Sequence, residues 1–177
     1  SDMSDHAQEM VQVTDATERI VHWLLAGSCL TCLFTGIGFM FQTWSFIPTL
    51  FGGYYAAKWI HIFSGVIFTA SLIYGYFMWK KDCVFEADDG KWILNGGGYL
   101  WPTNNLPPVY KYNAGQKAFF WCVIVFGAVI ALSGLLMWNA DLFPNALTRW
   151  GFALHALSAM VIGSFFVVHL YLGTIGN

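Results

Sequence analysis

Four long apolar segments dominate the pattern of this chain. They cover about residues 20–41, 59–79, 118–138 and 150–175, and none contains Asp, Glu, Lys or Arg. Each can cross a bilayer as a helix, which needs about 20 apolar residues. In lipid, a helix satisfies all its backbone groups within one segment, and uniformly apolar runs do not alternate as barrel strands do. The pattern predicts an all-α integral membrane protein: a four-transmembrane-helix bundle forming a single membrane domain over residues 1–177.

The connections between these segments differ in length and polarity. The first, 42–58, contains Pro48 and two glycines, and the third, 139–149, is short. The second, 80–117, carries most of the charge and a Gly/Pro-rich insert at 95–108 whose role is open. No linker separates domains, so the chain reads as one unit.

Basic residues near the segment ends predict the orientation. Of the eight Lys and Arg residues, six flank the side that holds the N-terminus and loop 80–117. These six are Arg19, Lys80, Lys81, Lys91, Lys111 and Lys117. Because cytoplasmic loops carry the excess of Lys and Arg, we expect the N-terminus, loop 80–117 and the C-terminus to be cytoplasmic.

Composition and cysteines narrow the function. The chain is 57% hydrophobic and 10% charged, against about 25% charged in soluble proteins, so the lipid bilayer is its expected partner. The net charge of −2 and the scattered basic residues argue against a nucleic-acid partner. The N-terminal residues lack the basic, then apolar, pattern of a cleavable signal peptide. Cys29 and Cys32 form a C-x-x-C followed by Leu33, which is not a c-type haem attachment signal.

Four histidines lie inside the predicted spans, at positions 22, 61, 155 and 169, whereas His6 lies in the polar tail and receives no role. In a soluble core, a lone histidine is usually a hydrogen-bonded core residue. Ionisable residues within a bilayer are rare and mark a functional site by default. We therefore expect four buried histidines with a shared function.

Helical geometry pairs these histidines by depth. His155 and His169 lie 14 residues apart, which puts them about 40° apart in direction and about 21 Å apart along one helix. Because alternate spans run in opposite directions, His22 shares the cytoplasmic level with His169. His61 shares the outer level with His155.

Each pair can hold one haem iron from two sides through neutral imidazole nitrogens, which predicts two stacked b-type haems. A zinc or copper site needs ligands that converge on one point, which histidines about 21 Å apart cannot do. A proton relay usually recruits Asp or Glu, and the predicted spans contain neither. Glycines at 36, 65, 134 and 163 would admit a flat macrocycle or serve ordinary helix packing. Arg19 and Lys58 lie one turn before His22 and His61, where they can meet haem propionates or snorkel to the interface.

Two motifs resemble a known family. They are Thr17-Glu18-Arg19-Ile20-Val21-His22-Trp23 and Lys111-Tyr112-Asn113-Ala114-Gly115-Gln116-Lys117, the latter followed by Phe120-Trp121. Together with the four histidines, they resemble the cytochrome b (gamma) subunit of respiratory membrane-bound formate dehydrogenases, from about residue 17 to 175. The first motif also occurs in hydrogenase and thiosulfate reductase cytochromes.

The resemblance implies the same pairing of histidines and a menaquinone site near Asn113, Gly115 and Gln116. From the residues alone, Asn113 would be a helix N-cap. It also implies an electron-transfer, quinone-reducing subunit of an oxidoreductase complex in the bacterial inner membrane, with substrate oxidation on a partner. The implied partners are an iron–sulfur subunit and a molybdenum or tungsten catalytic subunit. The family usually continues into a basic cytoplasmic tail, whereas this sequence ends at Asn177.

Two alternatives stay open from the sequence. The chain could be the cytochrome b subunit of a hydrogenase or thiosulfate reductase, or it could be a haem-free membrane anchor or transporter bundle. The metal content of the co-purifying partners distinguishes the first alternative, and a haem assay distinguishes the second.

Overall fold

The computed structural model describes residues 14–98 and 111–174, and all regular elements in these ranges are helices. Four helices are long and apolar enough to cross a membrane: α1 (Ala16–Met40), α3 (Tyr54–Trp79), α5 (Ala114–Trp138) and α6 (Asn145–Thr174). They confirm the expectation of four helical spans. Each begins four or five residues before its predicted start.

Capping residues explain the early starts of two helices. The Asp15 carboxylate accepts a hydrogen bond from the Glu18 backbone N–H at 2.7 Å, and the Glu18 carboxylate accepts one from the Asp15 N–H at 3.0 Å. Asn113 and Gln116 form the same reciprocal pair at the start of α5, both bonds being 2.9 Å. This capping box satisfies backbone donors that a helix start leaves free. Charged or polar first turns therefore extend helices beyond the charge-free windows.

The connections contain short helices that the pattern of apolar residues did not predict. The first holds η1 (Gln42–Trp44) and α2 (Ile47–Leu50), and the third holds η3 (Ala140–Leu142). Within the expected loop 80–117, the structure forms α4 (Ala87–Leu94) and η2 (Gly96–Gly98). Most of the insert at 95–108 lies outside the described residues.

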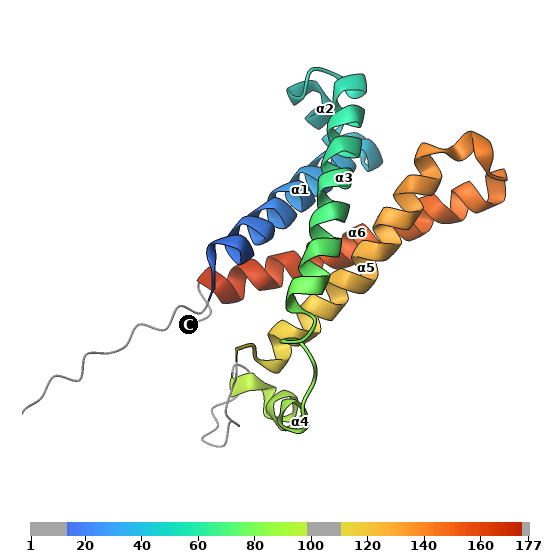
Figure 1. Ribbon diagram of the computed structural model, residues 1–177. Coiled ribbons are helices and arrows are strands. Elements are labelled where there is room, and N and C mark those ends of the chain that lie inside the picture. Colours follow the sequence, from blue (N-terminus) through green and yellow to red (C-terminus); the bar gives the residue numbers. More distant parts are fainter. Residues whose placement is uncertain (1–13, 99–110, 175–177) are drawn as a thin grey trace, which may run out of the picture.

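The four long helices form two hairpins (Figure 1). α1 packs mainly against α3, and α5 packs mainly against α6, while α3 and α5 join the two hairpins. α6 returns across the molecule, so its C-terminal half lies near the start of α1 (Figure 1). α4 packs against α5 at the end of the bundle where α1 and α5 begin.

The core lies between the two levels of histidines. Phe68 and Leu72 of α3 and Ile162 of α6 are buried together. Ile162 lies seven residues from both His155 and His169, which places it about 10 Å along the helix from each. Most other large apolar side chains on these helices are exposed in the chain alone. Such a surface suits a bilayer, where lipid covers the outward faces.

Candidate functional site

The structure brings the predicted histidines together in two pairs. The ring centres of His61 on α3 and His155 on α6 are 6.2 Å apart. Those of His22 on α1 and His169 on α6 are 6.3 Å apart. Both pairs bridge one hairpin to the other, and α6 contributes one ring to each.

The hydroxyl of Thr35 fixes the ring of His61. The Thr35 Oγ1 lies 2.7 Å from the His61 Nδ1 and 2.7 Å from the carbonyl oxygen of Thr31. A carbonyl only accepts hydrogen bonds, so the Thr35 hydroxyl donates its proton to Thr31 and accepts one from the His61 Nδ1–H. The proton on Nδ1 leaves the lone pair on Nε2, which is the form that binds a metal.

His155 has a matching environment on α5. Its Nδ1 lies 3.0 Å from the carbonyl oxygen of Ile130 and 3.1 Å from the Ser133 Oγ. Because the carbonyl can only accept, the His155 Nδ1 carries the proton and donates. His155 therefore also presents an unprotonated Nε2, as a metal ligand must.

The spacing of both pairs fits a single iron held between two imidazoles. Two imidazoles on opposite sides of one metal, each with a bond of about 2 Å, have ring centres about 6 Å apart. Among the described residues, no group of three or more His, Cys, Asp or Glu could hold a metal ion. Two nitrogens from the protein with a planar macrocycle supplying the others is the arrangement that these pairs fit.

The glycines near the histidines fall into distinct settings. A Cβ on Gly36 would lie 3.6 Å from the His61 ring, and one on Gly134 would lie 3.2 Å from the His155 ring. A Cβ on Gly163 would meet only the Leu33 side chain, at 3.6 Å, whereas one on Gly65 would enter open space. Gly134 thus lets α5 approach the His155 ring closely, whereas Gly36 has room for an ordinary contact with the His61 ring. Gly163 serves helix packing, and Gly65 leaves room for a flat group.

His22 and His169 differ from the other pair, and the expectation that all four histidines are buried is wrong for them. Both are exposed in the chain alone, while His61 and His155 are half-buried. The His169 ring stacks on Phe119 with centres 4.7 Å apart and planes 2° apart. Within the described residues, no hydrogen-bond acceptor contacts a ring nitrogen of His22 or His169.

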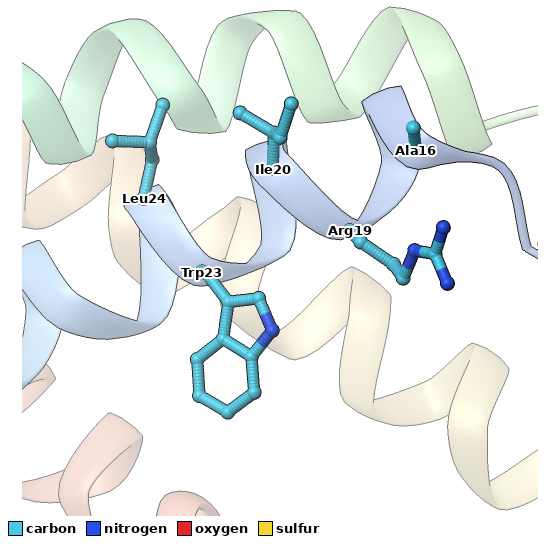
Figure 2. A pocket seen from close by; sticks show the side chains of 5 residues that line it. All are labelled: Ala16, Arg19, Ile20, Trp23 and Leu24. Atoms are coloured by element: carbon cyan, nitrogen blue, oxygen red, sulfur yellow. The ribbon is translucent and has the colours of Figure 1, made fainter.

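Arg19 and Lys58 are exposed and lie one turn before His22 and His61. Arg19 and Trp23 line an open hollow at the start of α1, where Figure 2 shows both side chains leaving the helix on the same side. Neither Arg19 nor Lys58 makes an ion pair in the part of the chain that the structure describes. Both cations are therefore available to an anionic group beside the histidines.

The predicted quinone residues form the first turn of α5. The side-chain oxygens of Asn113 and Gln116 are used in capping, which leaves their NH₂ groups as donors. Among the described residues, neither NH₂ group has an acceptor. A Cβ on Gly115 would lie 3.2 Å from the indole ring of Trp92, so the glycine lets α4 approach α5. The sequence did not single out Trp92 because it lies in a polar segment without a long apolar pattern.

Two groups of ion pairs secure this end of the bundle. The Lys111 ammonium contacts Glu18 at 2.7 Å and Asp82 at 2.9 Å, and the hydrogen bond to Glu18 and then that to Asp82 raise the pKa of Lys111 above its usual range. The buried Lys117 ammonium contacts Asp89 of α4 at 2.8 Å. The hydrogen bond from Lys117 holds the pKa of Asp89 below its usual range. Sequence reasoning missed these pairs, because partners up to 93 residues apart meet only in the folded chain.

Paired imidazoles carried by membrane-spanning helices are the arrangement expected of a membrane-bound cytochrome b. The chain belongs to the prokaryotic cytochrome b561 family, whose profile matches residues 13–177. Membership of this family implies haem b. The resemblance to formate dehydrogenase cytochromes is confirmed by curated relatives.

These relatives include three formate dehydrogenase cytochrome b556 subunits. The cytochrome b556(fdo) subunit of Escherichia coli K12 is 29% identical over 159 residues, which are 88% of this chain and 75% of the relative. The nitrate-inducible cytochrome b556(Fdn) subunit of the same strain is 25% identical over 168 residues, which are 93% of this chain and 77% of the relative. The cytochrome b556 subunit of Haemophilus influenzae is 27% identical over 163 residues, 87% of this chain and 66% of the relative.

Proposed function

We propose that this chain is the dihaem cytochrome b subunit of a membrane-bound formate dehydrogenase. It would pass electrons from a periplasmic oxidoreductase through two b haems to menaquinone near the cytoplasmic face. The observation that carries this proposal is the presence of two imidazole pairs that share helix α6. The ring centres are 6.2 Å apart in His61/His155 and 6.3 Å apart in His22/His169. The names of the relatives support formate as the donor's substrate.

In this proposal His61 and His155 hold the periplasmic-side haem, and His22 and His169 hold the cytoplasmic-side haem. When bound, each haem would supply reversible one-electron transfer. With two histidines holding each haem, the site would suit electron relay and not oxygen activation. Arg19 and Lys58, both exposed beside the histidines, would pair with haem propionates.

Menaquinone would bind at the start of α5. The NH₂ groups of Asn113 and Gln116 would donate hydrogen bonds to a quinone carbonyl, and Gly115 would allow close approach to the helix. The capping bonds of 2.9 Å hold both amides in place while leaving those donors free. In the present structure Trp92 contacts this glycine, so α4 borders the same site.

The proposed setting is the bacterial inner membrane, with loop 80–117 and both termini cytoplasmic. The proposed partners are an iron–sulfur subunit and a molybdenum or tungsten catalytic subunit, which would carry the oxidation of substrate. Moving one electron inward against 100 mV costs about 2.3 kcal/mol. Quinone reduction at the cytoplasmic face would therefore conserve energy as membrane potential.

A pyridine haemochrome assay on the purified complex tests the haem content. We expect two haems b per chain in the wild type and one in His169→Ala, with His155→Ala losing the other. His6→Ala, which changes a histidine in the N-terminal tail, is the control and should keep both. Zero haems in the wild type would favour the haem-free anchor, and two haems in His169→Ala would refute the ligand assignment.

Metal analysis of the co-purifying subunits tests the donor. Molybdenum or tungsten together with iron in a complex that oxidises formate supports the proposal. A nickel–iron partner would instead identify a hydrogenase cytochrome.

A further inference from the structure

Each hairpin contains a hydroxyl residue followed by glycine, and both pairs face a histidine on the next long helix. Thr35-Gly36 on α1 faces His61 on α3, and Ser133-Gly134 on α5 faces His155 on α6. The same local arrangement thus occurs once in each half of the bundle, although the two halves show no evident internal repeat in sequence.

The hydrogen bonds of the two hydroxyls match closely. Thr35 Oγ1 lies 2.7 Å from the carbonyl oxygen four residues earlier and 3.2 Å from the one three residues earlier. Ser133 Oγ lies 2.6 Å and 3.1 Å from the equivalent carbonyls. Thr35 is 0% exposed and Ser133 is 7% exposed. Because their protons are directed to these carbonyls, both oxygens present lone pairs to the facing histidine.

The other histidine pair has no such support. Within the described residues, no hydroxyl or carbonyl contacts a ring nitrogen of His22 or His169. The His169 ring stacks face to face on the Phe119 ring, with ring centres 4.7 Å apart. This ring cannot accept the Nδ1–H hydrogen bond of His169, because that bond lies in the plane of the imidazole. The two predicted haem sites therefore differ in the partners of their ligands, not in the ligands themselves.

We propose that Thr35 and Ser133 are positioning residues. Their hydrogen bonds make His61 and His155 stronger electron donors to iron than His22 and His169, so that the haem held by His61 and His155 has the lower midpoint potential. This inference rests on the proposed haem-binding function. A hydrogen bond from the Nδ1–H of a ligating histidine fixes its orientation and raises its basicity. A more basic ligand favours ferric over ferrous iron, which lowers the potential. Electron transfer from the His61/His155 site to the His22/His169 site is then downhill.

Redox titration of the intact complex, followed by haem absorbance, tests the proposal. In Thr35→Val and in Ser133→Ala, both haems should be retained, and the potential of the lower-potential haem should rise. The rise should be smaller in Ser133→Ala, because the Ile130 carbonyl oxygen, 3.0 Å from the His155 Nδ1, still accepts its hydrogen bond. The higher-potential haem should keep its value, and the double variant should show a larger shift than either single variant. Thr35→Ser, which restores the hydroxyl, should return the potential to the wild-type value.

Ser28→Ala is the matched control. Ser28 is a 7% exposed residue of α1 whose hydroxyl lies 2.6 Å and 3.2 Å from carbonyl oxygens of its own helix. It makes no hydrogen bond to any histidine that the structure describes. Its replacement should leave both potentials unchanged. His169→Ala removes one haem and so identifies which of the two titrations belongs to the His61/His155 site.

The outcomes separate this inference from the proposed function. Unchanged potentials in Thr35→Val and Ser133→Ala, with two haems present, would overturn the inference alone. A shift confined to the His22/His169 haem would overturn it too. Absence of haem from the wild-type complex would refute the proposed function before any variant is considered. If Thr35→Val fails to accumulate, the comparison of Ser133→Ala with Ser133→Thr provides the same test.

Discussion

The imidazole rings of His61 and His155 lie 6.2 Å apart across the boundary between the two helical hairpins. The second pair, His22 and His169, bridges the same boundary. Direct packing between hairpins is concentrated where α3 meets α5. A group bound between the histidines would therefore add two further connections between the hairpins.

Haem should stabilise the association of the hairpins. A ligand that binds only the folded state at a thousand times its Kd adds about 4 kcal/mol to stability. We expect the haem-free protein to unfold at a lower temperature than the haem-bound protein in the same detergent, as measured by circular dichroism. Equal unfolding temperatures would show that helix packing alone holds the hairpins together.

Gly134→Ala should disturb the site of His155. The added Cβ would lie 3.2 Å from the His155 ring, so the ring must move, and such overpacking costs about 1–3 kcal/mol. We expect reduced haem retention with one of the two haem absorbance components affected. Gly36→Ala is the control, since its Cβ would lie at an ordinary contact distance of 3.6 Å from His61 and should be tolerated.

Asn113→Asp should separate helix capping from quinone binding. Aspartate keeps the side-chain oxygen that accepts the Gln116 N–H bond of 2.9 Å, and Asp caps helices as well as Asn. It lacks the NH₂ group proposed to donate to quinone. We expect unchanged thermal stability but a raised KM for a menaquinone analogue.

Gln116→Glu makes the equivalent change at the other end of the capping box and should behave like Asn113→Asp. Asn113→Ala should lose both properties, with a stability cost of about 1 kcal/mol. Unaltered quinone kinetics in both acidic variants would place the quinone elsewhere.

The ion pair between Lys117 and Asp89 should hold α4 against α5. The Lys117 side chain is 4% exposed and that of Asp89 is 12% exposed. Asp89→Asn leaves a buried ammonium without its anionic partner, which costs roughly 3 kcal/mol or more. We expect faster proteolysis within residues 80–117 at neutral pH. Asp88→Asn is the control and should be cleaved at the wild-type rate. The Asp88 side chain is 43% exposed and, among the described residues, forms an ion pair with Lys91 alone.

Docking of α4 should also depend on pH. The hydrogen bond from Lys117 lowers the pKa of Asp89 below its usual value. A lowered pKa means that the contribution to stability is fully present above about pH 4 and disappears as the pH falls through the lowered value. We expect proteolysis by an acid-active protease to accelerate below about pH 4 in the wild type. Asp89→Asn should show a smaller change over the same range.

Prediction from sequence succeeded where long-range information was unnecessary. Four charge-free runs of about 20 residues predict four helical spans, because a helix is the only single-segment structure that satisfies its backbone hydrogen bonds in lipid. Helix starts were placed too late, because capping boxes such as Asp15 with Glu18 use charged residues that a hydropathy window excludes. The helix α4 was missed, since eight residues with acidic and basic side chains give no apolar pattern of sufficient length.

By itself, the sequence determined the number of spans and the levels of the histidines, because helix rise and span direction depend only on position along the chain. Tertiary structure alone decided the rest. It decided that Thr35 and Ser133 support one pair of histidines and that His22 and His169 remain exposed. The reason is physical: hydrogen-bond partners and exposure depend on how neighbouring helices cross and rotate, and this depends on side-chain packing between segments far apart in sequence.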